Sequence, residues 1–130
     1  MMTSKSSGFT LIELLVVVAV VGILAAVGIT SYNGYILSTQ KKSAENLMQQ
    51  ISLGQTEYYS NDGNYYSATS TSCTASSTTS TNIEIKLLGS ADVINDDTAY
   101  DMCIMADTTS NYLIKAEEKD GTCVITMTSN

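Results

Sequence analysis

The sequence predicts an α+β fold in which a long N-terminal helix, first hydrophobic and then amphipathic, packs on a four-stranded antiparallel sheet. Three observations predict it: an apolar run near the N-terminus, apolar residues at helical spacing after it, and apolar residues at alternate positions near the C-terminus. The expected segments are a leader at 1–8, a membrane-length helix at 9–30, its amphipathic continuation at 31–60, a Ser/Thr-rich connection at 61–82 and the sheet at 83–130.

The apolar segment runs from Phe9 to Ile29. As a helix these residues extend about 32 Å, which is close to the thickness of a bilayer's hydrocarbon core. Gly22 and Gly28 interrupt the large side chains. Glycine weakens a helix by about 1 kcal/mol relative to alanine in water and allows helices to approach closely, so both positions are candidates for local helix flexibility.

One carboxylate, Glu13, lies inside this apolar run. A charged side chain near the centre of a bilayer costs about 3 kcal/mol, so Glu13 needs a partner. A first-turn position would also suit it, because the helix dipole favours negative charge there. A secretory signal peptide or a plain single-pass anchor are the alternative interpretations of the whole run.

The segment GFTLIELLVVVAVVGILAA resembles the N-terminal segment of type IV prepilins and of the related pseudopilins of type II secretion. The resemblance covers about residues 8–35. It implies cleavage by prepilin peptidase between Gly8 and Phe9, followed by N-methylation of the Phe9 amine. It also implies that Glu13 pairs with the Phe9 ammonium group of a neighbouring subunit during assembly.

The resemblance implies a type IV pilin fold and a structural subunit, major or minor, of a type IV pilus. Such a subunit is inserted in the bacterial inner membrane with its head in the periplasm, contacts lipid there, and passes through an assembly platform into an extracellular filament with other pilin subunits. The filament serves adhesion, motility or DNA uptake. The alternatives are a pseudopilin of a type II secretion system and a membrane-anchored binding module that never assembles.

The amphipathic segment at 31–60 places apolar residues at three-, four- or seven-residue spacings, apart from one wider gap. The turn-forming string at 61–64 is expected to end this helix. Tyrosines flank the turn, and we expect them to cover the end of the core rather than to form a binding surface. The apolar residues are Ile36, Ala44, Leu47, Ile51 and Tyr58, and the tyrosines are Tyr58, Tyr59, Tyr65 and Tyr66.

Residues 67–81 are almost all serine, threonine or alanine, which predicts a surface loop that buries little. Period-two alternation then predicts strands at 83–87, 99–106, 111–116 and 122–128. On the last two strands, one face is expected to carry the apolar side chains of Tyr112, Ile114 and Ala116, and of Cys123, Ile125 and Met127.

The three cysteines, Cys73, Cys103 and Cys123, follow the apolar run. Lys5 on the leader side favours a cytoplasmic N-terminus and an oxidising environment for the head, which allows one disulfide. Cys103 and Cys123 lie on strands separated by one strand, about 9.6 Å apart, which disfavours their pairing. Cys73 can reach either; the sequence favours Cys73–Cys123, with Cys103 as the alternative partner and buried thiols as another possibility.

The chain has a net charge of −7 and no His, Arg, Trp or Pro. Such a chain lacks the clustered cations that bind nucleic-acid phosphates. Without histidine and without grouped carboxylates, no catalytic site, metal site or cofactor site is indicated. The sequence therefore predicts a substrate of processing enzymes rather than an enzyme.

Overall fold

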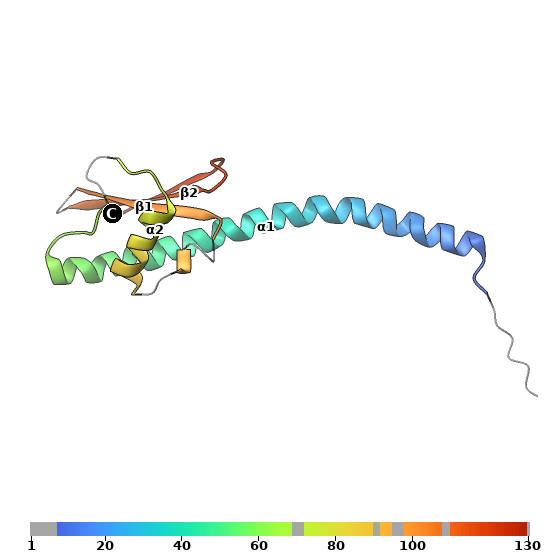
Figure 1. The fold of residues 1–130 in the computed structure, drawn as a ribbon, viewed down its shortest axis with the longest axis horizontal. Coiled ribbons are helices and arrows are strands. Elements are labelled where there is room, and N and C mark those ends of the chain that lie inside the picture. Colours follow the sequence, from blue (N-terminus) through green and yellow to red (C-terminus); the bar gives the residue numbers. More distant parts are fainter. Residues whose placement is uncertain (1–7, 69–71, 90–91, 95–97, 108–109, 130) are drawn as a thin grey trace, which may run out of the picture. The chain divides into compact units, whose positions relative to one another are not determined.

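The structure, a computed structural model, describes residues 8–68, 72–89, 92–94, 98–107 and 110–129. The predicted leader therefore lies, apart from Gly8, outside the described residues. The chain divides into two compact units, residues 1–38 and 39–130. The elements in Figure 1 are the helices α1 (Leu11–Asp62) and α2 (Ser77–Ile83), the π-helix η1 (Glu84–Leu88), and the strands β1 (Tyr100–Asp107), β2 (Asn111–Glu118) and β3 (Val124–Thr128).

The sheet is antiparallel in the order β1-β2-β3, with Ile104 opposite Ile114 and Ile114 opposite Met127. The predicted α+β class and the three C-terminal strands are confirmed. Gly121 has a φ of 76° and donates its N–H to the Glu118 oxygen at 2.7 Å, which closes the β2–β3 hairpin in a conformation suited to glycine.

The predicted fourth strand at 83–87 is wrong, because these residues are helical and the described sheet has three strands. Alternation would place Ile83 and Ile85 on one face, but Ile83 is buried whereas Ile85 is 59% exposed. The buried side chain between them is Glu84, whose carboxylate accepts hydrogen bonds from the backbone N–H groups of Asp92 and Ile94. In the helical conformation the Glu84 carboxylate reaches the backbone N–H groups of Asp92 and Ile94.

The expected surface loop at 67–81 is also partly wrong, since α2 begins inside it. Ser76 is the N-cap: its side chain accepts the Thr79 N–H at 3.3 Å, and the Thr79 hydroxyl accepts the Ser76 N–H at 2.9 Å. This reciprocal capping box satisfies two donors that a helix start leaves free. Residues 69–71 of this segment lie outside the described part.

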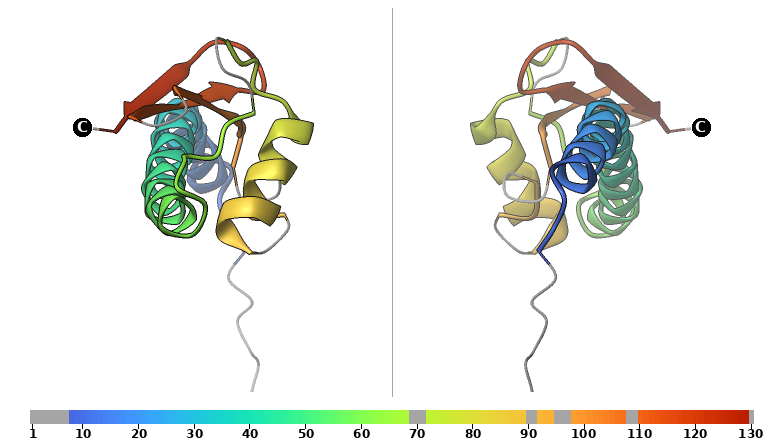
Figure 2. Two further views of the ribbon diagram at one scale, coloured as in Figure 1. Left: turned by 90° about the vertical axis from the view of Figure 1, so that its left-hand side faces the viewer. Right: turned by 90° about the vertical axis from the view of Figure 1, so that its right-hand side faces the viewer.

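The core of the second unit lies between one face of the sheet and the C-terminal part of α1, as Figures 1 and 2 show. The predicted apolar face of α1 is confirmed at Ala44, Leu47 and Ile51, whereas Ile36 and Tyr58 are only partly buried and lie outside the core cluster. The inward-facing positions of β2 and β3 are confirmed. From α1 the buried side chains are Ala44, Leu47, Met48 and Ile51; from β1 and β2 they include Met102, Ile104, Tyr112, Ile114 and Ala116, with Ile125 and Met127 packed beside them.

Helix α1 ends where the sequence predicts. It stops at Asp62, and Gly63 follows with a φ of 74° and donates its N–H to the Tyr59 oxygen at 2.9 Å. The chain then returns along the helix. The fully buried Gln55 side chain donates to the Tyr66 oxygen at 2.7 Å and accepts the Tyr66 N–H at 2.8 Å.

The tyrosines at this end of α1 cover the core, as expected. Tyr65 and Tyr66 pack against the core. Tyr59 stacks on Tyr65 with ring centroids 4.6 Å apart, and Tyr65 in turn lies 4.9 Å from Tyr112. The Tyr112 hydroxyl shares a hydrogen bond of 2.6 Å with Ser52. The rings therefore join α1, the returning chain and β2.

At Gly54 the backbone of α1 lies close to Leu87 of η1. A Cβ atom there would lie 2.7 Å from the Leu87 carbonyl oxygen and 3.1 Å from the Leu87 Cβ. The first distance is shorter than packed atoms tolerate and is to backbone, and the second is tight. Only glycine fits this position without moving η1.

The disulfide joins Cys73 to Cys103, with Cα atoms 6.0 Å apart, and Cys123 is free. The favoured Cys73–Cys123 pairing is therefore wrong, and the alternative partner is correct. The reason is the two-residue period of a strand. Met102 and Ile104 face the core, so Cys103 between them faces outward, whereas Cys123 packs against the core.

The loop that carries Cys73 is also held by a hydrogen bond to a carboxylate on the same outer face. Glu117 accepts the Ala75 N–H at 2.9 Å and forms an ion pair with Lys115 at 2.6 Å. The Lys115 hydrogen bond, followed by the Ala75 N–H, holds the pKa of Glu117 below its usual range. The disulfide and the hydrogen bond from Ala75 to Glu117 together fix this loop against the sheet.

The free edge of β1 is covered by the Ser/Thr-rich segment. The Thr79 hydroxyl donates to the Met102 oxygen at 2.8 Å, and the Met102 N–H donates to the Ser80 hydroxyl at 2.9 Å. Further along, the Ala68 N–H donates to the Ile104 oxygen at 3.0 Å. An exposed strand edge is a site for unwanted pairing, and these groups occupy it.

Candidate processing and assembly site

The predicted processing residues lie at the start of α1. Gly8 and Phe9 precede the helix, and the Phe9 side chain is 88% exposed. Thr10 is the last residue before α1, and Glu13 is in the first turn. The scissile bond predicted between Gly8 and Phe9 therefore lies in non-helical chain, one residue before the helix cap.

Glu13 has a local partner that sequence reasoning missed. Its Oε2 atom accepts the Thr10 N–H at 2.9 Å and the Thr10 hydroxyl at 2.7 Å, and the Glu13 N–H donates to the Thr10 hydroxyl at 3.4 Å. The string Thr-Leu-Ile-Glu is a capping box, and this pattern is readable in the sequence. Hydrogen bonds to the charged form reduce the penalty of placing a carboxylate in an apolar environment.

The geometry also brings Glu13 close to the N-terminus that cleavage at the predicted site would create. The backbone amide that donates to Glu13 belongs to Thr10, the residue directly after Phe9. An ammonium group on Phe9 would therefore lie one residue from a nitrogen that already contacts the carboxylate. The site can hold an anion at a helix start and attract a terminal amine.

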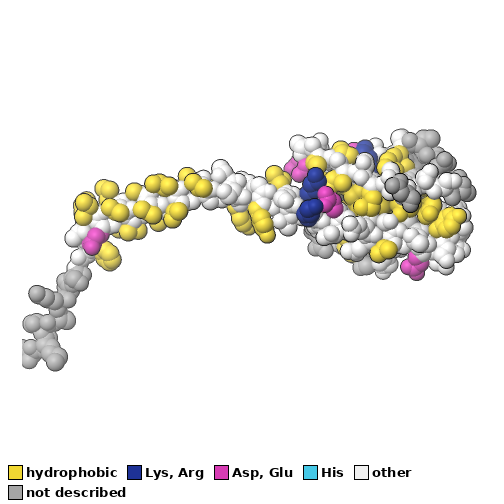
Figure 3. Space-filling model, turned by 180° about the vertical axis from the view of Figure 1, so that it is seen from behind, with side chains coloured by type: hydrophobic (Ala, Val, Ile, Leu, Met, Phe, Trp, Pro, Cys, Tyr) yellow, Lys and Arg dark blue, Asp and Glu magenta, His cyan; other side chains and the backbone are white. Residues whose placement is uncertain are grey.

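The helix that follows is apolar and unburied. Every side chain of residues 9–30 is exposed, and Figure 3 shows hydrophobic side chains along this part of the helix. By length and composition this is the one helix in the described part of the chain that could cross a membrane. A Cβ atom at Gly22 or Gly28 would meet nothing within 4 Å, so neither glycine is needed for packing inside one copy.

Comparison with known proteins supports this site. Residues 3–29 match the family model of the prokaryotic N-terminal methylation motif. Over 94 residues the chain is 40% identical to a fimbrial protein of Neisseria meningitidis serogroup A / serotype 4A (strain DSM 15465 / Z2491), covering 72% of this chain and 54% of that protein. The chain belongs to the type IV pilin family. This pilin is 44% identical over 64 residues to the type IV major pilin protein PilE1 of Neisseria gonorrhoeae. The aligned residues cover 49% of this chain and 39% of PilE1.

The similarity is concentrated near the N-terminus. Against the type IV major fimbrial protein FimA of Dichelobacter nodosus the identity is 62%, over 39 residues that cover 30% of the pilin and 24% of FimA. The pilin spans about half or less of the length of these relatives. No solved structure matches it.

The head of the pilin carries a buried phenol beside the free thiol. Burial, and next the hydrogen bond with Cys123, raise the pKa of Tyr100 to about 12. In the described ranges no three His, Cys, Asp or Glu side chains are grouped so as to hold a metal ion. Because Tyr100 is buried in the core cluster, we assign it to the packing of the second unit.

Proposed function

We propose that this pilin is a structural subunit of a type IV pilus. The observation that carries the proposal is the combination of a capped carboxylate, Glu13, with the apolar part of α1 up to residue 30, in which no side chain is buried within its own chain. Such a surface is stable only in lipid or against other apolar helices. The names of its relatives, which are fimbrial proteins and major pilins, favour a pilus over a secretion pseudopilus.

The proposed sequence of events begins in the inner membrane, with the head in the periplasm. Prepilin peptidase cleaves after Gly8 and the new Phe9 amine is methylated. The assembly platform then moves the subunit from lipid into a filament, where Glu13 pairs with the Phe9 ammonium of a neighbouring subunit. In an apolar environment this attraction is strong, and an unpaired carboxylate is penalised, so the pair selects the correct position.

Helix flexibility at Gly22 and Gly28 is part of the same proposal. Neither position is packed against other atoms, and each is a weak point of the helix. Local adjustment there would allow neighbouring apolar helices to pack closely in the filament. The pilin acts as a structural part, and the chemistry at its N-terminus is performed by the processing enzyme.

The test is the mature N-terminus of the protein recovered from sheared filaments, measured by mass spectrometry. A methylated Phe9 is expected. The variant Gly8→Arg should remain uncleaved in the membrane fraction, because a peptidase that fits a hydrogen side chain has no room for a long cation. Normal mature protein from this variant, or a filament-free wild type, would refute the proposal.

A further inference from the structure

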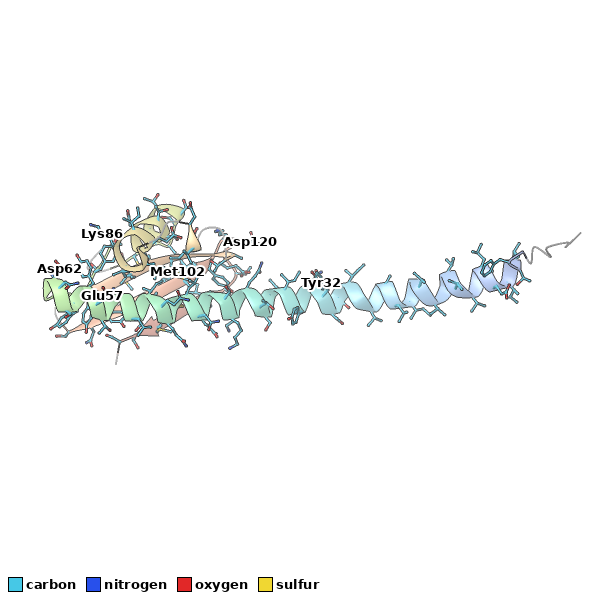
Figure 4. The ribbon with its side chains drawn as sticks, turned by 90° about the horizontal axis from the view of Figure 1, so that it is seen from below. Tyr32, Glu57, Asp62, Lys86, Met102 and Asp120 are labelled. Atoms are coloured by element: carbon cyan, nitrogen blue, oxygen red, sulfur yellow. A yellow bond between two sulfur atoms is a disulfide. The ribbon has the colours of Figure 1, made fainter. Side chains whose placement is uncertain are left out.

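The two edges of the sheet are protected differently. At the β1 edge, Met102, which Figure 4 labels, exchanges hydrogen bonds with the hydroxyl groups of Thr79 and Ser80. The other edge is β3, which lies on the side of the sheet away from α2, as Figure 2 shows. Among the described residues no segment pairs with this edge, and β3 has neither a charged side chain nor a proline to keep another strand away.

The hydrogen bonds between β2 and β3 determine which backbone groups of β3 point outward. The Ser129 N–H donates to the Tyr112 oxygen at 3.0 Å, and the Glu118 N–H donates to the Cys123 oxygen at 2.9 Å. In an antiparallel pair, alternate residues bond to the neighbouring strand, so the odd-numbered residues from 123 to 129 bond to β2. The residues whose N–H and C=O groups point outward are therefore Val124, Thr126 and Thr128.

These outward groups are self-complementary. When two copies of β3 pair antiparallel with Thr126 opposite Thr126, Val124 of each copy lies opposite Thr128 of the other. All three of these pairs are of the hydrogen-bonded type, so the three N–H and three C=O groups of each copy find partners. A register shifted by two residues within β3 would leave some of them without a partner.

The side chains also match in this register. On the core side of the sheet, Ile125 of one copy lies opposite Met127 of the other, which continues the apolar face that packs on α1. On the outer side Val124 is 53% exposed and lies opposite the exposed Thr128, so two β-branched side chains meet. The pairing therefore covers apolar surface that one copy leaves open.

Charge does not oppose this contact, although two copies with a net charge of −7 repel each other in general. The strand β3 is uncharged, and the charged residues opposite it on β2 are Lys115 and Glu117. These two side chains form an ion pair of 2.6 Å within each copy. The β3 edge is therefore a part of the head where two copies can approach without bringing like charges together.

We propose that the outward edge of β3 is a docking strand for β3 of a second copy of this chain, paired antiparallel about Thr126. Main-chain hydrogen bonds supply the contact, as in other cases of strand addition to a sheet edge. The contact is isologous and closes on itself, because the same strand serves both copies. The two-fold axis reverses the direction of one copy, whereas copies in the proposed filament point the same way. The inference therefore does not rest on the proposed function.

The experiment is disulfide cross-linking of the full-length protein in detergent, in a Cys123→Ser background, read as covalent dimer on a non-reducing gel. Thr126→Cys places the two new thiols on Cα atoms about 5.5 Å apart, which is within disulfide reach. Val124→Cys is the matched control on the same exposed face, because its two thiols lie about 14 Å apart along the paired strands. Dimer should form about tenfold or more faster from Thr126→Cys than from Val124→Cys.

A double variant checks the register directly. Val124→Cys combined with Thr128→Cys places a thiol of each copy opposite one of the other, so efficient cross-linking should return. Within one chain these two positions are about 14 Å apart and cannot link to each other.

A backbone variant tests the hydrogen bonds themselves. Thr126→Pro removes an outward N–H group and none that bonds to β2, and proline is tolerated at such an edge position. It should raise the dissociation constant of the pair about tenfold or more in analytical ultracentrifugation, because both hydrogen bonds at the centre are lost. Thr126→Val is its control, since it keeps the backbone groups and the β-branch and should associate like wild type.

Strong cross-linking at 126 and in the 124/128 double variant, with little at 124 alone, would establish the contact. Equal cross-linking of Thr126→Cys and Val124→Cys, as expected from association through the apolar helix alone, would overturn the inference. So would a Thr126→Pro protein that associates as tightly as Thr126→Val. None of these outcomes bears on the proposed function, which the mature N-terminus in filaments tests.

Discussion

Replacing Gln55 by glutamate should destabilise the head by an amount that depends on pH. In the structure the Gln55 Nε2 atom donates to the Tyr66 oxygen at 2.7 Å while its Oε1 atom accepts the Tyr66 N–H at 2.8 Å. The change keeps the shape and the acceptor but places a second oxygen against a carbonyl. Loss of one hydrogen bond costs about 1 kcal/mol, and an unpaired buried charge adds about 2–3 kcal/mol.

The pH dependence follows from the protonation state of the introduced carboxyl. Burial and the facing carbonyl raise its pKa in the folded state above the unfolded value. A raised pKa means that stability is present below the unfolded pKa and is lost as the pH rises through the folded pKa. At low pH the protonated carboxyl can donate to the Tyr66 oxygen, so the deficit relative to wild type should shrink.

The assay is urea unfolding in detergent, followed by the near-ultraviolet signal of the tyrosines, at pH 7 and at pH 4.5. Gln55→Met is the control, because it removes both hydrogen bonds without adding a titrating group and should cost about 2 kcal/mol at either pH. Equal stability of Gln55→Glu and wild type at pH 7, or a deficit unchanged by acid, would refute the reasoning.

Four further outcomes follow from the structure. Glu13→Val should insert normally in the membrane but abolish or shorten filaments, and Thr10→Val should give a milder loss in the same assay because it removes one of the hydrogen bonds to the carboxylate. Cys73→Ser should lower the free energy of unfolding of the head by roughly 3–4 kcal/mol in the chain-entropy estimate, measured by urea unfolding. Gly54→Ala should destabilise by about 1–2 kcal/mol despite the better helix propensity of alanine, and thermal unfolding would show it. Between pH 10 and 12 the wild type should lose about 2 kcal/mol that Tyr100→Phe retains, since the unfolded phenol ionises at a lower pH than the folded one.

Each of these results has a clear contrary outcome. Full filament yield from Glu13→Val would leave that residue a simple helix cap. A Cys73→Ser protein as stable as wild type would mean that the loop is held by Glu117 and the β1 edge alone. Gly34→Ala is the control for Gly54→Ala, because a Cβ atom at Gly34 meets nothing within 4 Å. Parallel alkaline losses in wild type and Tyr100→Phe would assign the effect to other groups.

The parts of the fold that were predictable from the sequence are those where one periodic pattern had no competitor. The apolar face of α1 and the last three strands were read from spacing alone, and the turn at Gly63 from its residue types. The prediction of a strand at 83–87 failed because three apolar residues at alternate positions are too few to distinguish a strand from a short helix. The structure decides between them through Glu84, whose backbone partners are distant in the sequence.

The candidate site was predictable for a different reason. Gly8, Phe9 and Glu13 lie within six residues, so no knowledge of the fold was needed to place them together. The disulfide required such knowledge, because Cys73 lies 30 residues from its partner and the sequence does not say which face of the sheet Cys73 approaches. Counting inward and outward positions along β1 excludes Cys123 as soon as that face is known.

The covering of the β1 edge by Thr79 and Ser80 has a consequence for how this region can vary. A neighbouring strand would pair with every second residue of the β1 edge. At Met102 two hydroxyl groups take this role instead: the Thr79 hydroxyl donates to the Met102 oxygen, and the Ser80 hydroxyl accepts the Met102 N–H. Most of the surrounding serines and threonines should then tolerate substitution. Loss of the Thr79 or Ser80 hydroxyl would leave a backbone group of the buried residue Met102 without this hydrogen bond. A saturation mutagenesis profile of residues 72–81 should therefore show Thr79 and Ser80 as intolerant positions, together with the disulfide residue Cys73 and the N-cap Ser76, in an otherwise permissive stretch. Serine and threonine should be interchangeable at 79, and residues lacking a hydroxyl should be rejected there.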